Sequence, residues 1–258
     1  MSAPILLLGK NGQIGRELCR TLGPLGNVAA FGREQLDLRD GDAIQRKLRD
    51  IRPALIVNAA AWTDVDGAED NRNEALAINA DAPAALARHA AGSGALLIHF
   101  STDYVFDGRT DVPYRETDRT RPINVYGESK SEGERRILET GAACLILRTS
   151  WIYGHHGKNF VRTFLQRARE QEELAVVEDQ IGCPTWSRTI AEAVASVLAR
   201  CADRERFDID AKSSGVHHVC AAGSASWYDF ACAILRLDPL RHEHRCRTIR
   251  PVSTGAFP

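Results

Sequence analysis

The sequence predicts an α/β protein with a doubly wound parallel sheet and a smaller, partly interleaved C-terminal lobe. Three observations support this fold class. Apolar segments of strand length alternate with segments of helical spacing, the connections between them are short, and a glycine-rich turn joins the first strand to the first helix. The alternation changes after Arg148. We therefore expect one domain over residues 1–150 and another over residues 151–258.

Five strands with helices between them are expected in the first domain. The segment 54–58 is apolar throughout, as in a parallel strand that helices cover on both faces. The segment 40–51 has its apolar residues on one helical face. The predicted strands are 5–8, 27–31, 54–58, 95–100 and 143–147, and the predicted helices follow the glycine turn and cover 40–51, 71–91 (interrupted only by Pro83) and 126–138.

The C-terminal lobe has a less regular pattern, which we interpret as a substrate-covering lobe. An amphipathic helix is expected at 189–200, and Ser224 or Ser226 can cap a helix at 227–237. The other expected elements are a helix at 160–169, strands at 174–177 and 216–219, and a turn at 181–185.

Composition argues against several classes of partner. The formal net charge of −1 provides no field that would attract nucleic acid or an anionic membrane. No apolar run is long enough to span a bilayer, and the N-terminus lacks a signal-peptide pattern. The seven cysteines are scattered without a C-x-x-C pair, as is typical of free thiols in a reducing compartment. We expect a cytoplasmic protein.

The glycine-rich turn has the spacing Gly9-x-x-Gly12-x-x-Gly15 between an apolar strand and a helix. Glycines allow the backbone to approach a ligand closely, and the helix N-terminus offers N–H groups and a partial positive charge to a pyrophosphate. The spacing is one residue off the G-x-G-x-x-G fingerprint, and a purely structural turn is the alternative. We favour a dinucleotide site, which would make the sheet Rossmann-type.

A tyrosine and a lysine stand four residues apart, at Tyr126 and Lys130, in a predicted helix. This spacing places a phenol and an ammonium on one helical face. A nearby cation favours the phenolate, so we expect Lys130 to lower the pKa of Tyr126 toward the range of proton transfer. The alternative is a solvated lysine that stacks on a surface tyrosine.

Two further groups of residues follow predicted strands, where an α/β sheet binds its ligands. Ser101 and Thr102 come after the fourth strand, and their hydroxyls can bind a substrate oxygen or satisfy loop backbone groups. The small residues of the segment 58–61 would let a cofactor lie close, although tight helix packing would also need them. His242, His244 and Cys246 resemble metal-ligand spacing, but the arginines around them favour a solvated loop.

The motifs GKNGQIG, NAAAWTDVDGAE, STDYVFDG, VYGESK, RTSWIYG and EDQIGCPT together resemble the dTDP-4-dehydrorhamnose reductase family. That family belongs to the extended short-chain dehydrogenase/reductase superfamily. The resemblance covers nearly the whole chain. It implies reduction of the C4 ketone of dTDP-4-dehydro-β-L-rhamnose by a nicotinamide cofactor, the last step of dTDP-L-rhamnose synthesis.

The resemblance also implies roles for individual residues. Tyr126 would donate a proton to the ketone oxygen, and Lys130 would hold the nicotinamide ribose. Thr102 would bind the reacting oxygen, Asp103 would contact the sugar, and Trp151 would pack on the deoxysugar. The implied cofactor contacts are Gly9, Lys10, Asn11, Gly12, Gln13, Ile14 and Gly15 at the pyrophosphate, Asp37 and Leu38 at the adenine, and Ala60, Ala61, Trp62 and Thr63 along the channel.

The end of the second strand bears on the choice of cofactor. An acidic residue there binds the ribose 2′-hydroxyl of NAD, whereas an arginine accepts the 2′-phosphate of NADP. The first charged residue after this strand is Arg33, and the first carboxylate is that of the next residue, Glu34. We therefore predict NADPH, with Arg33 at its phosphate and NADH as the alternative cofactor.

Some members of the family carry a magnesium-linked dimer contact made by three glutamates. Glu17 and Glu192 match two of them, so Mg²⁺ is a weak expectation; two carboxylates alone are more often solvated surface charges. The third glutamate would lie in a family segment that follows PVSTGAFP, beyond residue 258. We expect a small nucleotide-sugar substrate and a monomer or homodimer.

Other functions compete with the reductase. A catalytically silent NADP-binding subunit, like the regulatory subunit of methionine adenosyltransferase, resembles the same fold. Another nucleotide-sugar enzyme, such as a different 4-ketosugar reductase, a 4,6-dehydratase or an epimerase, is a further alternative. Dehydratases of the superfamily have a glutamate at the position of Tyr104, so elimination lacks its partner here.

Overall fold

The computed structural model describes residues 3–202 and 206–256, which form two compact units. The first, here called the sheet unit, comprises the residues up to Thr149 together with Ile190–Val219. The second, here called the small unit, comprises Ser150–Thr189 and the residues from Cys220 onward. In the described part of the chain, no helix has both the length and the apolar character needed to cross a membrane.

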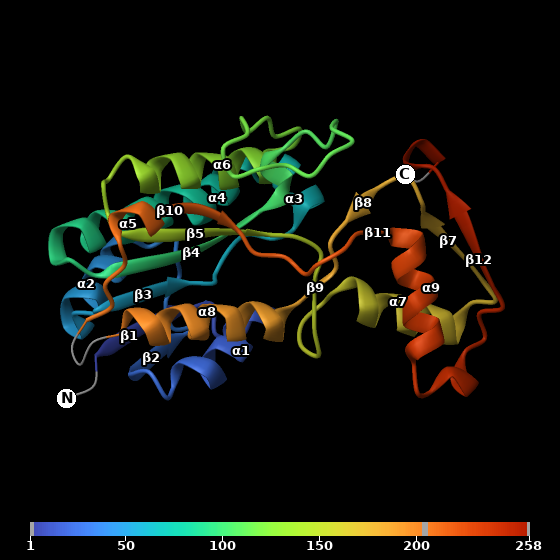
Figure 1. Ribbon diagram of the computed structural model, residues 1–258, viewed down its shortest axis with the longest axis horizontal. Helices are drawn as coiled ribbons and strands as arrows, with labels where there is room; N and C mark the ends of the chain where they lie inside the picture. The colour runs from blue at the N-terminus through green and yellow to red at the C-terminus, as the bar shows by residue number, and fades with distance from the viewer. Residues whose placement is uncertain (1–2, 203–205, 257–258) are drawn as a thin grey trace. The chain divides into compact units, whose positions relative to one another are not determined.

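A six-stranded sheet, parallel throughout, forms the centre of the sheet unit (Figure 1). Its order is β10-β5-β4-β3-β1-β2, so the direction of strand addition reverses between β1 and β3. Such a switch point opens a crevice at the carboxyl ends of the two strands, where ligands bind. The predicted fold class is confirmed. The strands are β1 Pro4–Leu8, β2 Asn27–Phe31, β3 Leu55–Asn58, β4 Leu96–Thr102, β5 Cys144–Thr149 and β10 Gly215–His218.

Helices cover both faces of the sheet (Figure 1). On one face, α2 (Gly41–Ile51), α5 (Ala82–Ser93) and α6 (Val125–Leu138) bury apolar side chains against β1, β3, β4 and β5. On the other face lie α1 (Gln13–Leu22) and α8 (Ser187–Cys201), which are joined by a hydrogen bond from Thr21 Oγ1 to the Ala191 carbonyl, 3.3 Å. Burial on both faces explains why these strands are almost wholly apolar.

The predicted helix over 71–91 is divided in the structure. α4 (Arg72–Leu76) leads into a π-helical turn (Ala77–Asp81), and α5 begins at Ala82. Pro83 lies in the first turn of α5, where the missing N–H is not needed, so it does not interrupt the helix. A helix that the sequence analysis missed, α3 (Val65–Asp70), begins where the Asp64 carboxylate accepts from the Gly67 N–H.

Two predicted boundaries change for reasons of strand pairing. β4 continues to Thr102 because Ser101 and Thr102 pair with Arg148 and Thr149 of β5, so both hydroxyl residues belong to the strand rather than to a following loop. The segment 190–219, assigned by the predicted boundary to the C-terminal lobe, belongs to the sheet unit. It supplies most of α8 and the sixth strand, β10.

The small unit packs two helices against short pairs of strands. Its core contains Phe164 and Ala168 of α7, Leu174 and Val176 of β7, and Ala231 of α9. Ser226 caps α9 in a capping box with Asp229, as one of the two predicted caps. The predicted turn at 181–185 is reduced to residues 183–184, because Ile181 and Gly182 form β8 and Thr185 begins β9. The elements are α7 Phe160–Glu170, α9 Trp227–Leu237, β7 Glu173–Val177 parallel to β12 Thr248–Val252, β6 Ile152–Tyr153 parallel to β9 Thr185–Trp186, and β8 Ile181–Gly182 antiparallel to β11 Ala225–Ser226.

Candidate active site

The glycine turn after β1 fits against the end of β3. Gly9 has φ +82°, and a Cβ there would lie 2.6 Å from backbone atoms of Ala59 and Ala60. A Cβ on Gly15 would lie 2.0 Å from the Gly9 carbonyl oxygen. Side chains at these two positions would push the turn away from the switch point. The two glycines therefore make a close-fitting cradle, whatever ligand it holds.

The N-terminus of α1 opens onto this cradle. Gly12 is the N-cap residue; no side chain caps the helix, and its first turn contains no acidic residue. Backbone N–H groups at such an end attract an anion. The other predicted contacts, Lys10, Asn11, Gln13 and Ile14, lie in the same turn or at the start of α1. This geometry fits the pyrophosphate of a dinucleotide.

The turn after β2 presents an exposed arginine. In the described part of the chain, Arg33 makes no ion pair with a carboxylate. Asp37 is instead engaged by the Arg39 guanidinium at 2.7 Å, and this hydrogen bonding holds the pKa of Asp37 below its usual range. Leu38 is buried beside it. Arg33 is thus available to a ligand anion, whereas the Asp37 carboxylate is already neutralised.

The segment after β3 is held by asparagine side chains. The Ala60 N–H donates to Asn58 Oδ1 at 3.2 Å, and the Trp62 N–H donates to Asn79 Oδ1 at 2.9 Å. Asn79 is fully buried and also donates to the Trp62 carbonyl and to Ser129 Oγ. These bonds fix the backbone of the predicted channel residues, which are Ala60, Ala61, Trp62 and Thr63.

Tyr126 lies near the C-terminal end of β4. Its hydroxyl hydrogen-bonds with Thr102, and Thr102 Oγ1 donates to Asp103 Oδ1 at 3.1 Å. Burial raises the pKa of Asp103 to about 6. Burial is also the largest influence on Tyr126, and it raises the pKa of the phenol even though the hydrogen bond with Thr102 lowers it. The structure thus brings Tyr126, Thr102 and Asp103 together.

Lys130 does not act on Tyr126 as the sequence predicted. Its Nζ donates to the Phe100 carbonyl at 2.6 Å and lies 3.3 Å from His99 Nε2, and the side chain is almost wholly buried. Burial lowers the pKa of Lys130 to about 8. The prediction that this ammonium lowers the pKa of Tyr126 is wrong, because burial raises that pKa and Lys130 is not among the groups that shift it. The reason is that Lys130 has a stronger partner in the backbone of β4.

A buried polar network surrounding Lys130 was missed by the sequence analysis. His99 Nδ1 lies 3.1 Å from Asn58 Nδ2, and burial lowers the pKa of His99 well below its usual range. One turn beyond Lys130, Glu134 receives two hydrogen bonds from the Arg148 guanidinium at 2.9 and 2.7 Å. A histidine inside the apolar segment LLIHF was the available signal, because a buried imidazole needs partners.

Trp151 belongs to the small unit. Its backbone has φ 45°, and its ring stacks on Trp227 with centroids 3.5 Å apart and planes 7° apart. In the same unit, His244 Nε2 lies 2.8 Å from Asp238 Oδ2, and both side chains are buried. The predicted loop at His242, His244 and Cys246 is therefore present, but it is solvated only in part because the His244 side chain is buried. His244 anchors this segment to Asp238 beside the first residues of β12.

The two glutamates compared with a magnesium site are joined by an arginine. The Arg20 guanidinium lies 3.4 Å from Glu17 and 3.1 Å from Glu192. The described residues also contain no cluster of three metal-ligating side chains. A cation already lies between these carboxylates, so we assign no magnesium site to them.

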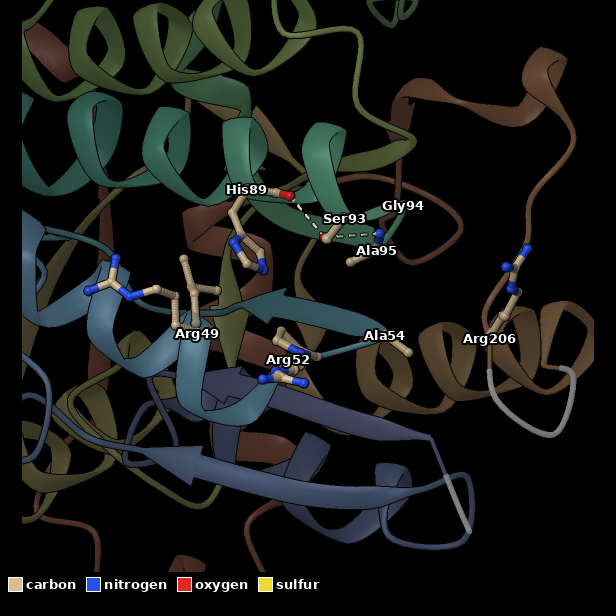
Figure 2. Close-up of a pocket in the computed structure, with 10 residues that line it drawn as sticks. Arg49, Arg52, Ala54, His89, Ser93, Gly94, Ala95 and Arg206 are labelled. Atoms are coloured by element: carbon tan, nitrogen blue, oxygen red, sulfur yellow. Dashed lines mark hydrogen bonds between the residues drawn. The ribbon is translucent and has the colours of Figure 1, made fainter.

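A cavity of about 560 Å³ lies at the amino-terminal end of the sheet, away from the glycine turn. Figure 2 shows Arg49 of α2 and Arg52, the residue that caps this helix, on one side of it and His89 and Ser93 of α5 on another. Burial lowers the pKa of His89. This cavity contains none of the predicted site residues, so its size alone is no indication of the reaction centre.

The parallel sheet, the glycine cradle at its switch point and the Tyr126–Lys130 pair define a Rossmann-type protein of the short-chain dehydrogenase/reductase class. A family model described as RmlD substrate binding domain matches residues 3–258. The chain belongs to this family, and the resemblance to the dTDP-4-dehydrorhamnose reductases is confirmed.

Two relatives and one solved structure illustrate the match. The dTDP-4-dehydrorhamnose reductase of Burkholderia thailandensis is 45% identical over 98% of this chain and 86% of its own length. That of Escherichia coli K12 is 44% identical over 89% of this chain and 76% of its own length. The Bacillus anthracis enzyme, solved in complex with NADP, superposes with a TM-score of 0.88 at 35% identity, covering 100% of this chain and 86% of that chain.

Proposed function

We propose that this protein reduces the C4 ketone of dTDP-4-dehydro-β-L-rhamnose to dTDP-β-L-rhamnose with a hydride from NADPH, or NADH as the alternative. This is the last step of dTDP-L-rhamnose biosynthesis. The observation that carries the proposal is the hydrogen bond between Tyr126 and Thr102 at the C-terminal end of β4. This contact supports the proposal, because one ketone oxygen bound beside it could contact both the phenol and the Thr102 hydroxyl.

Each residue has a distinct role in this mechanism. Tyr126 delivers its proton to the oxygen as the hydride reaches C4, and Thr102 holds that oxygen. A raised phenol pKa keeps Tyr126 protonated before the reaction, as a proton donor requires. Lys130 binds the nicotinamide ribose, for which it leaves its present contact with the Phe100 carbonyl. The sugar-binding roles of Asp103 and Trp151 are those that the family resemblance implies.

NADPH, when bound, supplies the hydride, and the chain's own residues supply its position. Gly9, Gly12 and Gly15 leave the space that a pyrophosphate needs, and a Cβ at Gly9 or Gly15 would alter it. The N–H groups at the start of α1 bind the pyrophosphate, and Arg33 accepts the 2′-phosphate. The Bacillus anthracis enzyme was solved with NADP, which supports this choice of cofactor.

A silent regulatory subunit is the second candidate. It would need the cradle but neither Tyr126 nor Thr102, so their hydrogen bond favours the enzyme. A different nucleotide-4-ketosugar reductase would keep all of these residues and differ only in its substrate. We also propose that the protein acts in the cytoplasm as a monomer or homodimer; its cysteines are free thiols, as that compartment favours.

The deciding experiment is NADPH oxidation with dTDP-4-dehydrorhamnose, with the product's stereochemistry determined by NMR. We expect dTDP-β-L-rhamnose. Tight NADPH binding without turnover of any dTDP-4-ketosugar would instead identify the silent subunit. Turnover of another ketosugar with a higher kcat/KM would identify a different reductase.

A further inference from the structure

We propose that Gly182 and Trp227 are positioning residues that hold the indole of Trp151 flat and in place for the sugar of the nucleotide-sugar ligand. This inference rests on the proposed function, which gives Trp151 the sugar-binding role. The three residues come from separate parts of the chain, and all lie in the small unit. No spacing motif joins them.

The backbone of Trp151 provides the first observation. Its φ of 45° lies in the left-handed region, and the only other residue besides glycine described there is Arg52. A bulky side chain in this region is strained and persists only where surrounding contacts hold it. One such contact is the Thr185 N–H, which donates to the Trp151 carbonyl at 3.2 Å. The strained backbone of Trp151 thus sets the direction of its indole.

Trp227 holds one face of the indole. The two rings stack with centroids 3.5 Å apart and planes 7° apart. Trp227 is itself fixed, because it begins the capped helix α9 and its Nε1–H donates to Gln180 Oε1 at 3.2 Å. The ring of Phe160 lies 4.6 Å from that of Trp227. Trp227 is therefore a rigid support for Trp151.

Gly182 makes room for the edge of the same ring. A Cβ on Gly182 would lie 2.3 Å from Trp151 Cε2 and 2.6 Å from its Nε1. The φ angle of Gly182 is one that other residues adopt, so this position needs glycine for space rather than for backbone freedom. Any larger residue would displace the indole.

These contacts differ from ordinary core packing because Trp151 stays partly exposed. A core residue is held by burial, whereas this indole is held by strain, one stacked ring and one glycine while part of it faces solvent. A flat, rigid aromatic surface binds the C–H groups of a pyranose ring. Fixing it beforehand removes the cost of ordering the side chain on binding.

The test compares two ligands that share a nucleotide and differ by the sugar. We would measure the Kd of dTDP and of dTDP-L-rhamnose by calorimetry for wild type, Gly182→Ala, Trp227→Leu and Trp227→Phe. Trp186→Leu is the control, since this indole of the small unit contacts Arg188 and does not stack on Trp151. The exciton couplet of stacked indoles in circular dichroism reports the geometry without any ligand.

We expect Gly182→Ala and Trp227→Leu to raise the Kd of dTDP-L-rhamnose about tenfold, which equals about 1.4 kcal/mol. The Kd of dTDP should stay unchanged. Gly182→Ala should also diminish the couplet, whereas Trp227→Leu removes one of its two indoles. Trp227→Phe keeps an aromatic ring against the indole and should therefore retain most of the affinity for dTDP-L-rhamnose. Trp186→Leu should change the Kd of neither ligand. Unfolding curves identify any variant that fails to fold. If one of Gly182→Ala and Trp227→Leu does not fold, the other decides.

A couplet lost in Gly182→Ala, which keeps both indoles, together with unchanged affinity for dTDP-L-rhamnose would overturn the positioning role. Equal weakening of both ligands would overturn it as well, because the effect would then not concern the sugar. These measurements need no turnover, so they stay separate from the proposed function. That function fails if wild type oxidises no NADPH with the ketosugar.

Discussion

The glycine cradle of the sheet unit and the Trp151 stack of the small unit are built in opposite ways. The cradle uses backbone and empty space, and its glycines lie within seven residues, Gly9 to Gly15. The stack uses large rings and joins Trp151, Gly182 and Trp227 across the small unit. A site made from one short segment can be recognised as a motif. A site assembled from distant segments shows itself only in the folded chain.

The two regions also differ in what fixes their functional groups. In the sheet unit, Lys130 and His99 are buried and held by polar partners. In the small unit, Trp151 is held by ring contact. A variant in the glycine cradle should therefore leave sugar binding almost unaffected, and a variant in the Trp151 stack should leave NADPH binding almost unaffected. The predictions below test that separation.

The largest effect is expected from removing the proton donor. Tyr126→Phe should lower kcat by about 10²–10⁴, the range typical of positioned acid–base groups. The Kd values of NADPH and dTDP-L-rhamnose should stay within about twofold of wild type, because only a hydroxyl is lost. Steady-state kinetics and calorimetry check both parts. Tyr114→Phe, which breaks a surface hydrogen bond to Asp107, is the control. Full activity in Tyr126→Phe would exclude this proton donor.

The second effect concerns the cradle. Gly15→Ala places a Cβ 2.0 Å from the Gly9 carbonyl and should destabilise the fold by about 2–4 kcal/mol, like other overpacked sites. NADPH binding should weaken at least tenfold, with the Kd of dTDP-L-rhamnose unchanged. Urea unfolding and calorimetry measure these values.

Gly92→Ala provides the matched control for the cradle. Gly92 lies within helix α5 with open space around its Cβ position, so the same substitution should stabilise the protein by about 0.4–1 kcal/mol. Equal effects of the two alanines would show that helix propensity, and not the close approach at Gly9, controls the result.

The sequence predicted the sheet well because its strands are buried on both faces and thus continuously apolar. The predicted fourth strand ended at Phe100 because Ser101 and Thr102 are polar. These two residues extend β4 by pairing with β5, and such a long-range contact cannot be predicted from the local sequence. The same limit applies to Lys130. Helical spacing correctly put it on the face of Tyr126, but its long side chain reaches the Phe100 carbonyl instead.

Long-range contacts also explain what the sequence analysis missed in the small unit. β12 directly follows the segment that was interpreted as a solvated loop, and it forms because Ile249 and Val252 pair with Leu174 and Val177 of β7. The predicted site residue Trp151 was recognised from its motif. Its left-handed backbone and its stack on Trp227 could not be foreseen from that motif.

A smaller effect should separate the two cofactors. Arg33→Ala should lower the ratio of kcat/KM for NADPH to that for NADH about tenfold, since a charge-assisted hydrogen bond to the phosphate contributes roughly 1.5–3 kcal/mol. Arg16→Ala, an exposed arginine on α1 that donates to the Asn11 carbonyl, is the control. An unchanged ratio in Arg33→Ala would remove Arg33 from cofactor selection.

The smallest effect is one of pH on stability, and it arises from Asp103. Burial raises the pKa of this carboxyl from 3.8 to about 6, so the folded protein favours the protonated form. The stability that this group provides is complete below pH 4 and is lost as the pH rises through 6. Asp103→Asn keeps an acceptor for the Thr102 hydroxyl but has no charge to bury.

We therefore expect Asp103→Asn to be more stable than wild type by roughly 1 kcal/mol at pH 8 and equal to it near pH 4. Urea unfolding at the two pH values measures the difference. The same variant should weaken binding of dTDP-L-rhamnose if Asp103 contacts the sugar, so a gain in stability would accompany a loss of function. A stability difference that is the same at both pH values would mean that the charge of Asp103 is not the cause.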